Sequence, residues 1–489
     1  MMSSDSRKTR GSERDEEEEE EEVLLLTLLA EVKPPAWVTV QEVIQNSNKF
    51  PATFPVHTAR LSTLLQVEGH EEKSLEEKVN SAYPLVHERV LPLLASFLTH
   101  KRTHGRRREK ELYSSLNILD LVDRLLKKRP VVFFNPNDNY VLRDGTEGSD
   151  GFEEIGHSHE KANLCLQEYM SYDEMKLSAL LCLSSRSVFI NDGSRHNRGV
   201  PGAQGTFQPE GVIVGMVGSR LEREGVMEWQ DCVVTPEQNT PERGYTQDPP
   251  PRRGLVREWG RLWEAAPLPT WEEAQAAPEG NFISLLSKVL FNKQLYHARI
   301  QLSAETLLCE AGARGAAAGL KAYVHVAGLG LGVWKISGLQ NQVFVDAWGD
   351  ALGAVDTTHI AYINFSWTRV STCRGVGEGE VFPGTEVRLH FSQRYLHTTV
   401  PPATLLIATY AMDSNAMPGN EYWKGMLSAS GEAAAACSSG VAELHNALIN
   451  PRITAHNLHV ASSGHVEHVA DYARRKLEER KRCSSSGKQ

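Results

Sequence analysis

Short apolar segments that alternate with helical segments constrain the fold of this chain more than any other feature. The apolar segments are 130-PVVFFNP-136, 187-SVFIN-191, 211-GVIVGMVGSRL-221, 359-HIAYINFSW-367 and 403-ATLLIATYA-411. A further strand, within 321–338, runs directly into a glycine loop. Helical patterns lie between them, over 168–184, 282–320 and 339–355. This alternation predicts a layered α/β domain.

Composition and pattern divide the chain into segments. Residues 1–22 end in a run of glutamates and cannot bury enough apolar surface to fold, so we expect them to be disordered. Leucine and valine recur at helical spacing across the next hundred residues, including 76–98. The predicted parts are a disordered acidic tail (1–22), a mainly helical N-terminal region (23–129), an α/β domain (130–454) with a Pro-rich surface insertion (235–254), and a polar C-terminal tail with a charged helix (455–489).

Bulk properties exclude several classes of protein. The longest apolar run, residues 23–30, is too short to span a bilayer and follows an acidic stretch, so neither a membrane nor a secretory protein is expected. The seven cysteines include no CxxC pair, which argues against a disulfide framework and a cysteine-type zinc site. A formal charge of −10 disfavours nucleic acid as a partner. We therefore expect a cytoplasmic or nuclear protein.

The first candidate site is a glycine loop. Gly328, Gly330 and Gly332 follow an apolar strand and precede a helix, so backbone N–H groups could line a concavity for an anion such as a diphosphate. A tight turn between strand and helix explains the same glycines equally well. A Rossmann dinucleotide site would need glycine at position 333, where the chain has Val333. No Lys-Ser or Lys-Thr pair closes a Walker loop.

The second candidate site is the polar, glycine-rich segment 191–211. The Asn191 amide could bind ribose hydroxyls, and Asp192 and Glu210 are the nearest carboxylates. Cleavage of a glycosidic bond at a ribose needs negative charge near the sugar and a carboxyl group that handles protons. In the alternative interpretation, Asp192 caps a turn and Glu210 is a solvated loop acid.

Histidine clusters raise the separate question of a metal ion. The histidines concerned are His157 and His159 in one loop, and His456, His459, His465 and His468 near the C-terminus. Flanking acids and a solvated helix favour ordinary surface histidines over ligands. The sequence therefore predicts no metal ligands and no cofactor.

Part of the second segment resembles the signature of poly(ADP-ribose) glycohydrolases. In that family an Asn is followed by a glycine cluster, a short spacer and Gln-Glu-Glu; here Asn191 is followed by Gly199, Gly202 and 208-QPE-210. The family's catalytic acid matches Glu210. Two departures matter: Pro209 replaces the first Glu, and the consecutive glycines are spread out. These changes argue against cleavage of poly(ADP-ribose) chains.

Several longer phrases resemble the MavL-like family over residues 131–451. They are 168-EYMSYDEMKLSALL-181, 189-FINDGSRHNRG-199, 326-VAGLGLGVW-334, 364-NFSW-367 and 408-ATYAMDSNAMPGNEYW-423. The resemblance implies a macrodomain-like α/β fold, a three-layer sandwich with a mixed central sheet, plus a helical N-terminal extension. It assigns diphosphate binding to Gly328, Leu329, Gly330, Leu331, Gly332, Val333 and Trp334. It implies that residues 413–422 help to close the pocket.

The resemblance also implies an activity. A MavL-like protein is expected to remove mono-ADP-ribose from a protein side chain, with arginine as the acceptor residue and ubiquitin as the acceptor protein of the family's namesake. Asn191, Gly199 and Gly202 would then bind the ligand. Asp192 would hold or protonate the leaving guanidinium, and Glu210 would bind a hydroxyl or activate water. Two alternatives stay open: a module that binds ADP-ribose without cleaving it, and a scaffold with a vestigial pocket.

Overall fold

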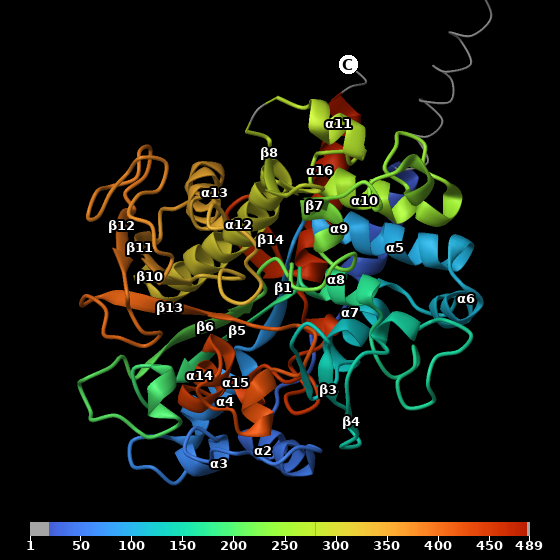
Figure 1. Ribbon diagram of the computed structural model, residues 1–489. Helices are drawn as coiled ribbons and strands as arrows, with labels where there is room; N and C mark the ends of the chain where they lie inside the picture. Colours follow the sequence, from blue (N-terminus) through green and yellow to red (C-terminus); the bar gives the residue numbers. More distant parts are fainter. Residues whose placement is uncertain (1–18, 279, 487–489) are drawn as a thin grey trace, which may run out of the picture.

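A mixed nine-stranded sheet forms the centre of the molecule (Figure 1). It is seen in a computed structural model that describes residues 19–278 and 280–486. The strands, in spatial order, are β12 (Arg388–Ser392), β11 (Ile360–Ser366), β10 (Lys321–Ala327), β13 (Thr404–Ala411), β6 (Glu210–Met216), β5 (Cys182–Val188), β1 (Tyr83–His87), β14 (His459–Ser462) and β15 (His465–His468). The first five are parallel, and β5 is antiparallel to both of its neighbours. The expected α/β class with a mixed sheet is confirmed; the closer likeness to a macrodomain remains a prediction.

Helices cover both faces of this sheet, as its central strands require. β6 and β10 are buried along almost their whole length, so neither face can be left to solvent. One face carries α12 (Lys293–Ala318) and α13 (Gln340–Ala354), and the other carries α4 (Glu72–Asn80) and α14 (Gly431–Ser438) (Figure 1). α12 crosses strands from β11 to β15 and ends at Gly319, whose φ of 64° suits a residue without a Cβ.

Both ends of the chain contribute strands to the same sheet. β1 comes from the N-terminal region and pairs with β5 and with β14 from the C-terminal segment. The boundaries predicted at 129/130 and 454/455 therefore do not coincide with breaks in the sheet. The helix expected over 76–98 is instead α4, β1 and a second helix. That second helix is α5 (Val90–His104). The other N-terminal helices are one over residues 19–30, α2 (Val40–Lys49), α3 (Leu61–Leu64), α6 (Arg107–Tyr113) and α7 (Ile118–Lys127).

Smaller elements surround this core. They are a sheet of β2 (Val132–Phe134), β3 (Asn139–Val141) and β4 (Glu147–Gly148), a sheet of β7 (Val233–Val234), β9 (Val289–Asn292) and β8 (Phe282–Leu286), and the helices α8 (Tyr172–Ser178), α9 (Trp229–Cys232), α10 (Gly254–Leu262), α11 (Trp271–Ala276), α15 (Val441–Leu444) and α16 (Val469–Ser486).

Two predicted helices are shorter in the structure. The first part of the helix expected over 282–320 is the β8–β9 hairpin, and α12 continues from Lys293 without the break expected near Ser303. The helix expected over 168–184 does begin at the predicted cap, where Ser171 and Glu174 form a capping box. It ends at Ser178, because the following residues enter β5.

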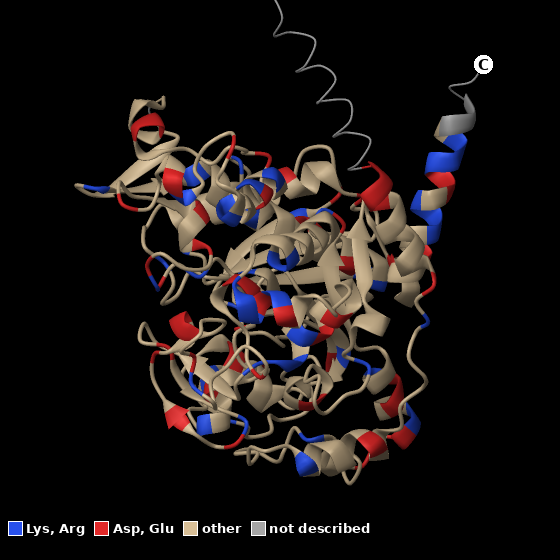
Figure 2. Ribbon diagram, turned by 90° about the vertical axis from the view of Figure 1, so that its right-hand side faces the viewer, with Lys and Arg blue, Asp and Glu red and all other residues tan. Residues whose placement is uncertain are grey.

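The predicted polar segments are more ordered than composition indicates. Most of the acidic tail, residues 1–18, lies outside the described residues, but a helix covers 19–30 and Glu19 lies 3.3 Å from Arg480 of α16. α16 is the charged helix that extends from the body in Figure 2. The insertion 235–254 buries Tyr245 and is therefore not wholly on the surface. No helix in the described part of the chain is long and apolar enough to cross a membrane.

Candidate functional site

The two predicted loops lie at opposite ends of the strands of the central sheet. An edge of the sheet here means the row of strand ends on one side, not an outer strand. Glu210 is the first residue of β6 and pairs with Val188, the last residue of the antiparallel β5. Residues 328–334 follow the last residue of β10, which is parallel to β6 through β13. At about 3.3 Å per residue, the length of β6 alone separates the two edges by about 20 Å. The expectation that Glu210 shares a cleft with residues 328–334 is therefore wrong.

The polar side chains of the 191–210 loop fold the loop itself. Asn191 is only 2% exposed, and its Nδ2 donates to the carbonyl of Val200. Asp192 Oδ1 accepts from the backbone N–H of Ser194 at 3.0 Å and from Asn197 Nδ2 at 2.6 Å. This is the turn-capping alternative that the sequence left open. The catalytic role predicted for Asp192 has no support in this geometry.

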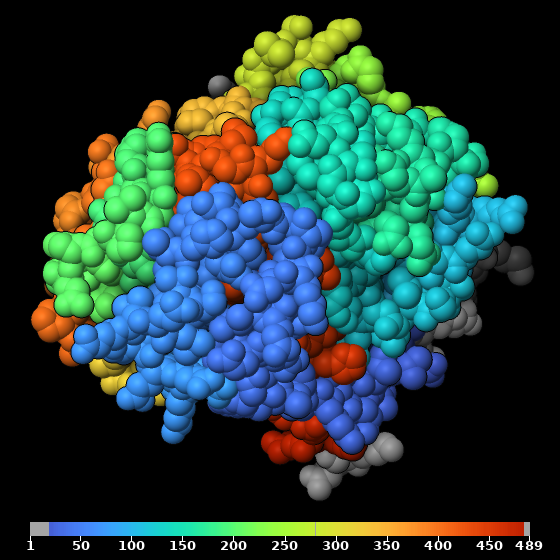
Figure 3. Space-filling view, turned by 90° about the horizontal axis from the view of Figure 1, so that it is seen from below, coloured from blue at the N-terminus to red at the C-terminus, as the bar shows by residue number. Residues whose placement is uncertain are grey.

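The glycines of this loop serve close packing. Val56 lies so close to Gly199 that an added Cβ would sit 2.3 Å from its side chain, and Thr58 Oγ1 donates to the Gly199 carbonyl. Gly202 packs against Phe207, and its N–H donates to a backbone carbonyl. In Figure 3 the N-terminal segment, in blue, lies against this green loop. Both glycines are thus explained by contacts within the protein.

Glu210 forms a surface ion pair. Its side chain is 44% exposed and lies 3.0 Å from Lys78 Nζ, which is itself almost fully buried. Lys78 also donates to Ser74 Oγ within α4. Glu210 therefore links α4 to the start of β6.

At the other edge, the loops that follow β6 and β10 touch through their backbones. A Cβ on Gly218 would lie 2.2 Å from the backbone nitrogen of Gly330, so only glycine fits. Gly330 has a φ of 72°, and a Cβ there would meet the backbone of Ser219 at 3.1 Å. Ligand sites in α/β sheets form at such carboxyl ends of parallel strands. The predicted loop residues at this edge are Gly328, Leu329, Gly330, Leu331, Gly332, Val333 and Trp334.

The loop after β10 is anchored at one end and open at the other. Leu329 is buried in the core, which holds the start of the loop. A Cβ on Gly332 would meet no atom within 4 Å, and Val333 is 83% exposed. This open backbone next to an anchored turn is what an anion cradle requires.

Arg220 is the most informative side chain at this edge. It is 2% exposed; its Nη2 lies 3.0 Å from Asp138 Oδ1, and its guanidinium lies 4.6 Å from the Phe133 ring centre and 5.9 Å from that of Trp334. Its Nε and Nη1 are buried and have no hydrogen-bond partner among the described residues. Buried donors without acceptors are costly, which makes Arg220 a candidate for binding an anion.

Sequence reasoning missed Arg220 because 211–221 looked like one strand. β6 in fact ends at Met216, and residues 217–223 form a loop. The signal that could have revealed the loop was the sequence Gly218-Ser219-Arg220, a glycine followed by polar residues at the end of an apolar run.

Besides its ion-pair partner Asp138, two further acids lie near Arg220. The pKa of Glu222 lies above its ordinary value, because burial raises this pKa more than the cation of Arg220 lowers it. Burial also raises the pKa of Asp413 to about 6, against the same cation. The carboxylate of Asp413 accepts hydrogen bonds from the backbone N–H of Asn415 and from Asn420 Nδ2. These bonds stabilise the loop after β13. Glu222 is only half-buried, and a carboxyl with a raised pKa at such a site suits proton transfer.

A separate cavity lies at the far end of the sheet. Its volume is about 360 Å³, and its lining includes Arg452, His459 and Arg474. None of its lining residues belongs to either predicted loop.

Comparisons with known proteins identify the family. The model of the family described as "ADP-ribosylhydrolase MavL-like" matches residues 41–475. The chain belongs to this family. It is 39% identical to the ADP-ribosylarginine hydrolase CG3568 of Drosophila melanogaster, over 91% of this chain and 90% of that protein. It is 38% identical to the ADP-ribosylarginine hydrolase CG2909 of the same organism, over 88% and 89% of the two chains. The MavL-like resemblance and the enzyme class, an ADP-ribosyl hydrolase, are confirmed.

Proposed function

We propose that this protein releases ADP-ribose from arginine side chains by hydrolysing the N-glycosyl bond. Its curated relatives are named ADP-ribosylarginine hydrolases and align with about nine-tenths of the chain. The substrate class is an ADP-ribosylated protein, and ubiquitin is the acceptor that the MavL-like resemblance suggests. The reaction would take place where β6 and β10 end.

The observation that carries this placement is Arg220. Its buried guanidinium has two free donor nitrogens and lies beside Trp334, at the end of the glycine loop. A diphosphate bound to the open backbone around Gly332 would present oxygens to those donors. The fixed charge of arginine suits this role, because burial cannot neutralise it at physiological pH.

Glu222 is the carboxyl best placed to handle protons. The guanidinium of the substrate is already cationic, so breaking its bond to the ribose carbon yields neutral guanidine and an oxocarbenium-like sugar. A water molecule then adds to that carbon. Glu222, as the carboxylate, takes a proton from the water and passes one to the guanidine. The products are ADP-ribose and an arginine side chain with its charge restored.

One experiment separates this site from the loop that the sequence favoured. An arginine-ADP-ribosylated peptide is incubated with wild type, Glu222→Gln, Glu210→Gln or Asp192→Asn, and free ADP-ribose is measured by chromatography. We expect Glu222→Gln to lower kcat by about 100-fold or more. The other two variants keep their local hydrogen bonds or lie on the surface, and should retain wild-type kcat. Full activity of Glu222→Gln together with loss of activity in Glu210→Gln would instead place the catalytic site in the loop 191–210.

A module that binds ADP-ribose without cleaving it is the second candidate function. The residue that favours it is Pro209, which replaces the first Glu of the glycohydrolase signature. Pro209 precedes β6 at the edge opposite the glycine loop, so the substitution has no bearing on catalysis at residues 217–223 and 328–334. Calorimetry with ADP-ribose, run beside the turnover assay, would expose a protein that binds the ligand but releases none.

A further inference from the structure

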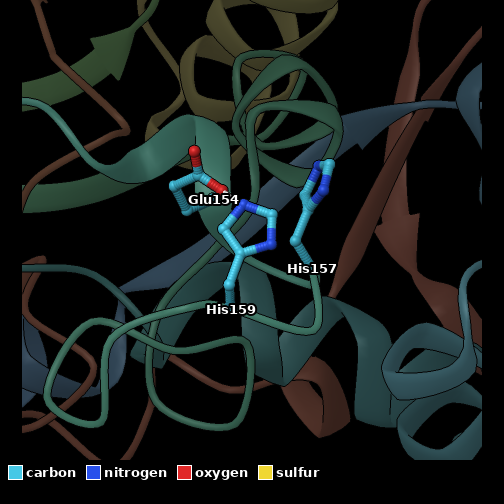
Figure 4. Close-up of side chains that lie close together, drawn as sticks. All are labelled: Glu154, His157 and His159. Atoms are coloured by element: carbon cyan, nitrogen blue, oxygen red, sulfur yellow. Dashed lines mark ion pairs between the residues drawn. The ribbon is translucent and has the colours of Figure 1, made fainter.

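Three potential metal ligands converge on one surface loop. The ligand atoms of Glu154, His157 and His159 all lie within 4.8 Å of one another. Figure 4 shows the carboxylate of Glu154 beside the His159 ring, with the His157 ring to the side. We propose that these three residues bind one divalent transition-metal ion of the zinc type. This site is separate from the proposed active site.

The backbone brings the three side chains together before any ion binds. Phe152–Glu154 form a short 3-10 helix, and the N–H of His157 donates to the carbonyl of Glu154 at 2.9 Å. Phe152 is buried, with its ring 4.7 Å from that of Phe133, so the start of the loop is fixed to the core. A site built on such a pre-folded segment loses little chain entropy when it binds an ion.

A carboxylate directly behind the loop fixes its far side. Glu160 Oε2 accepts from the N–H of Gly156 at 2.7 Å and of Leu166 at 2.9 Å. Its other oxygen lies 2.9 Å from Arg108 Nη1. Glu160 is therefore fully engaged and does not compete for the ion, while it holds the turn that presents His157 and His159.

The ligand types select the metal. Two imidazole nitrogens and one carboxylate oxygen suit zinc and its neighbours, whereas magnesium and calcium prefer oxygen ligands alone. Tetrahedral zinc needs its ligands about 3.4 Å apart, since each bond is about 2.0 to 2.1 Å long. The ligand atoms of Glu154 and His159 already lie closer together than that, and the exposed His159 can reach this spacing by side-chain rotation. A water molecule would take the fourth position.

The ion pair between Glu154 and His159 does not explain why His157 lies beside them. Glu154 and His159 pair with each other, which accounts for those two side chains. Among the described residues, neither ring nitrogen of His157 has a hydrogen-bond partner, although the ring centre lies 5.4 Å from that of His159. A metal ion would give all three side chains a partner.

The loop that carries the three ligands also contacts residues 217–223, which contain the proposed catalytic acid. Glu153 and Asp150, next to the cluster, lie 3.5 Å and 3.2 Å from Arg223, which follows Glu222. Bound zinc would therefore stiffen a segment in contact with residues 217–223. This consequence, unlike the binding itself, rests on the proposed function.

The test uses the full chain without an affinity tag, stripped with EDTA, dialysed and titrated with zinc chloride. Mass spectrometry of bound metal and competition with a chromophoric chelator measure stoichiometry and affinity. We expect one zinc ion per chain, a rise in Tm of a few degrees, and at least tenfold weaker binding in His157→Ala and His159→Ala.

His104→Ala is the matched control, because His104 lies 5.5 Å from His100 in ring distance but belongs to no such group of three among the described residues. It should bind zinc like the wild type. The site is refuted if wild type retains no zinc, or if zinc binding is the same in wild type, His157→Ala and His159→Ala. These readouts do not depend on turnover, so they stand apart from the test of the hydrolase.

Discussion

Replacing Gly218 by alanine tests whether the backbone contact between the loops 217–223 and 328–334 organises the proposed active site. The added Cβ would lie 2.2 Å from the nitrogen of Gly330 and 2.4 Å from the carbonyl carbon of Leu329. Ordinary contact begins near 3.4 Å, so the loops must separate by about 1.2 Å. Overpacking of this kind costs about 1 to 3 kcal/mol of stability. A displacement near 1 Å at a catalytic site lowers the rate by about 100-fold.

The assay compares Gly218→Ala with a glycine substitution that meets nothing. A Cβ on Gly353, exposed on α13, would find no atom within 4 Å. Both substitutions restrict the unfolded chain equally. The difference in kcat/KM between the two variants therefore reports the steric effect of the Cβ at position 218. We expect kcat/KM for an arginine-ADP-ribosylated peptide to fall about 100-fold in Gly218→Ala, with weaker ADP-ribose binding, and to be unchanged in Gly353→Ala. If Gly218→Ala retains kcat/KM within twofold of the control, the contact does not shape the site.

Three further outcomes follow from the geometry. Asp413→Asn removes a carboxyl whose pKa burial raises from 3.8 to about 6; because the native state binds this proton more tightly, wild-type stability should fall as pH rises through that window, and Tm measured against pH should show a shallower fall in the variant. Asp192→Ala should cost about 1 kcal/mol in chemical denaturation, whereas Asp192→Asn keeps the acceptor for Ser194; equal losses would contradict the turn-capping role. Arg220→Lys keeps the charge but loses the planar fork, so calorimetry should show ADP-ribose binding at least tenfold weaker; unchanged affinity would mean that the guanidinium does not face the diphosphate.

Strands with strong local signals were predicted well. The runs that form β10, β11 and β13 are rich in apolar and β-branched residues, and a glycine directly follows the first of them. The leucines of 282–292 also fit a helical period, so the sequence predicts a helix there. The segment forms a hairpin because β9 pairs with β7, and no local sequence pattern indicates that partner.

The same limit explains the prediction for residues 76–98. Residues 83–87 look like part of an apolar helix, but they fill a gap in the sheet between β5 and β14. The strand β14 that completes this arrangement lies more than 350 residues away in the sequence. Burial between distant strands overrides the local helical preference of such a short segment.

The sequence by itself determined the family, the α/β alternation and the glycine loop at 328–334, because these depend on residue type and local spacing. Only the tertiary structure decided which loop faces that glycine loop. β5 is antiparallel to β6, so residues 189–209 emerge at one edge of the sheet and residues 217–223 at the other. Strand direction follows from the packing of the whole sheet and leaves no mark in the residues of a single strand. For that reason we propose Glu222, in place of Glu210, as the acid beside residues 328–334.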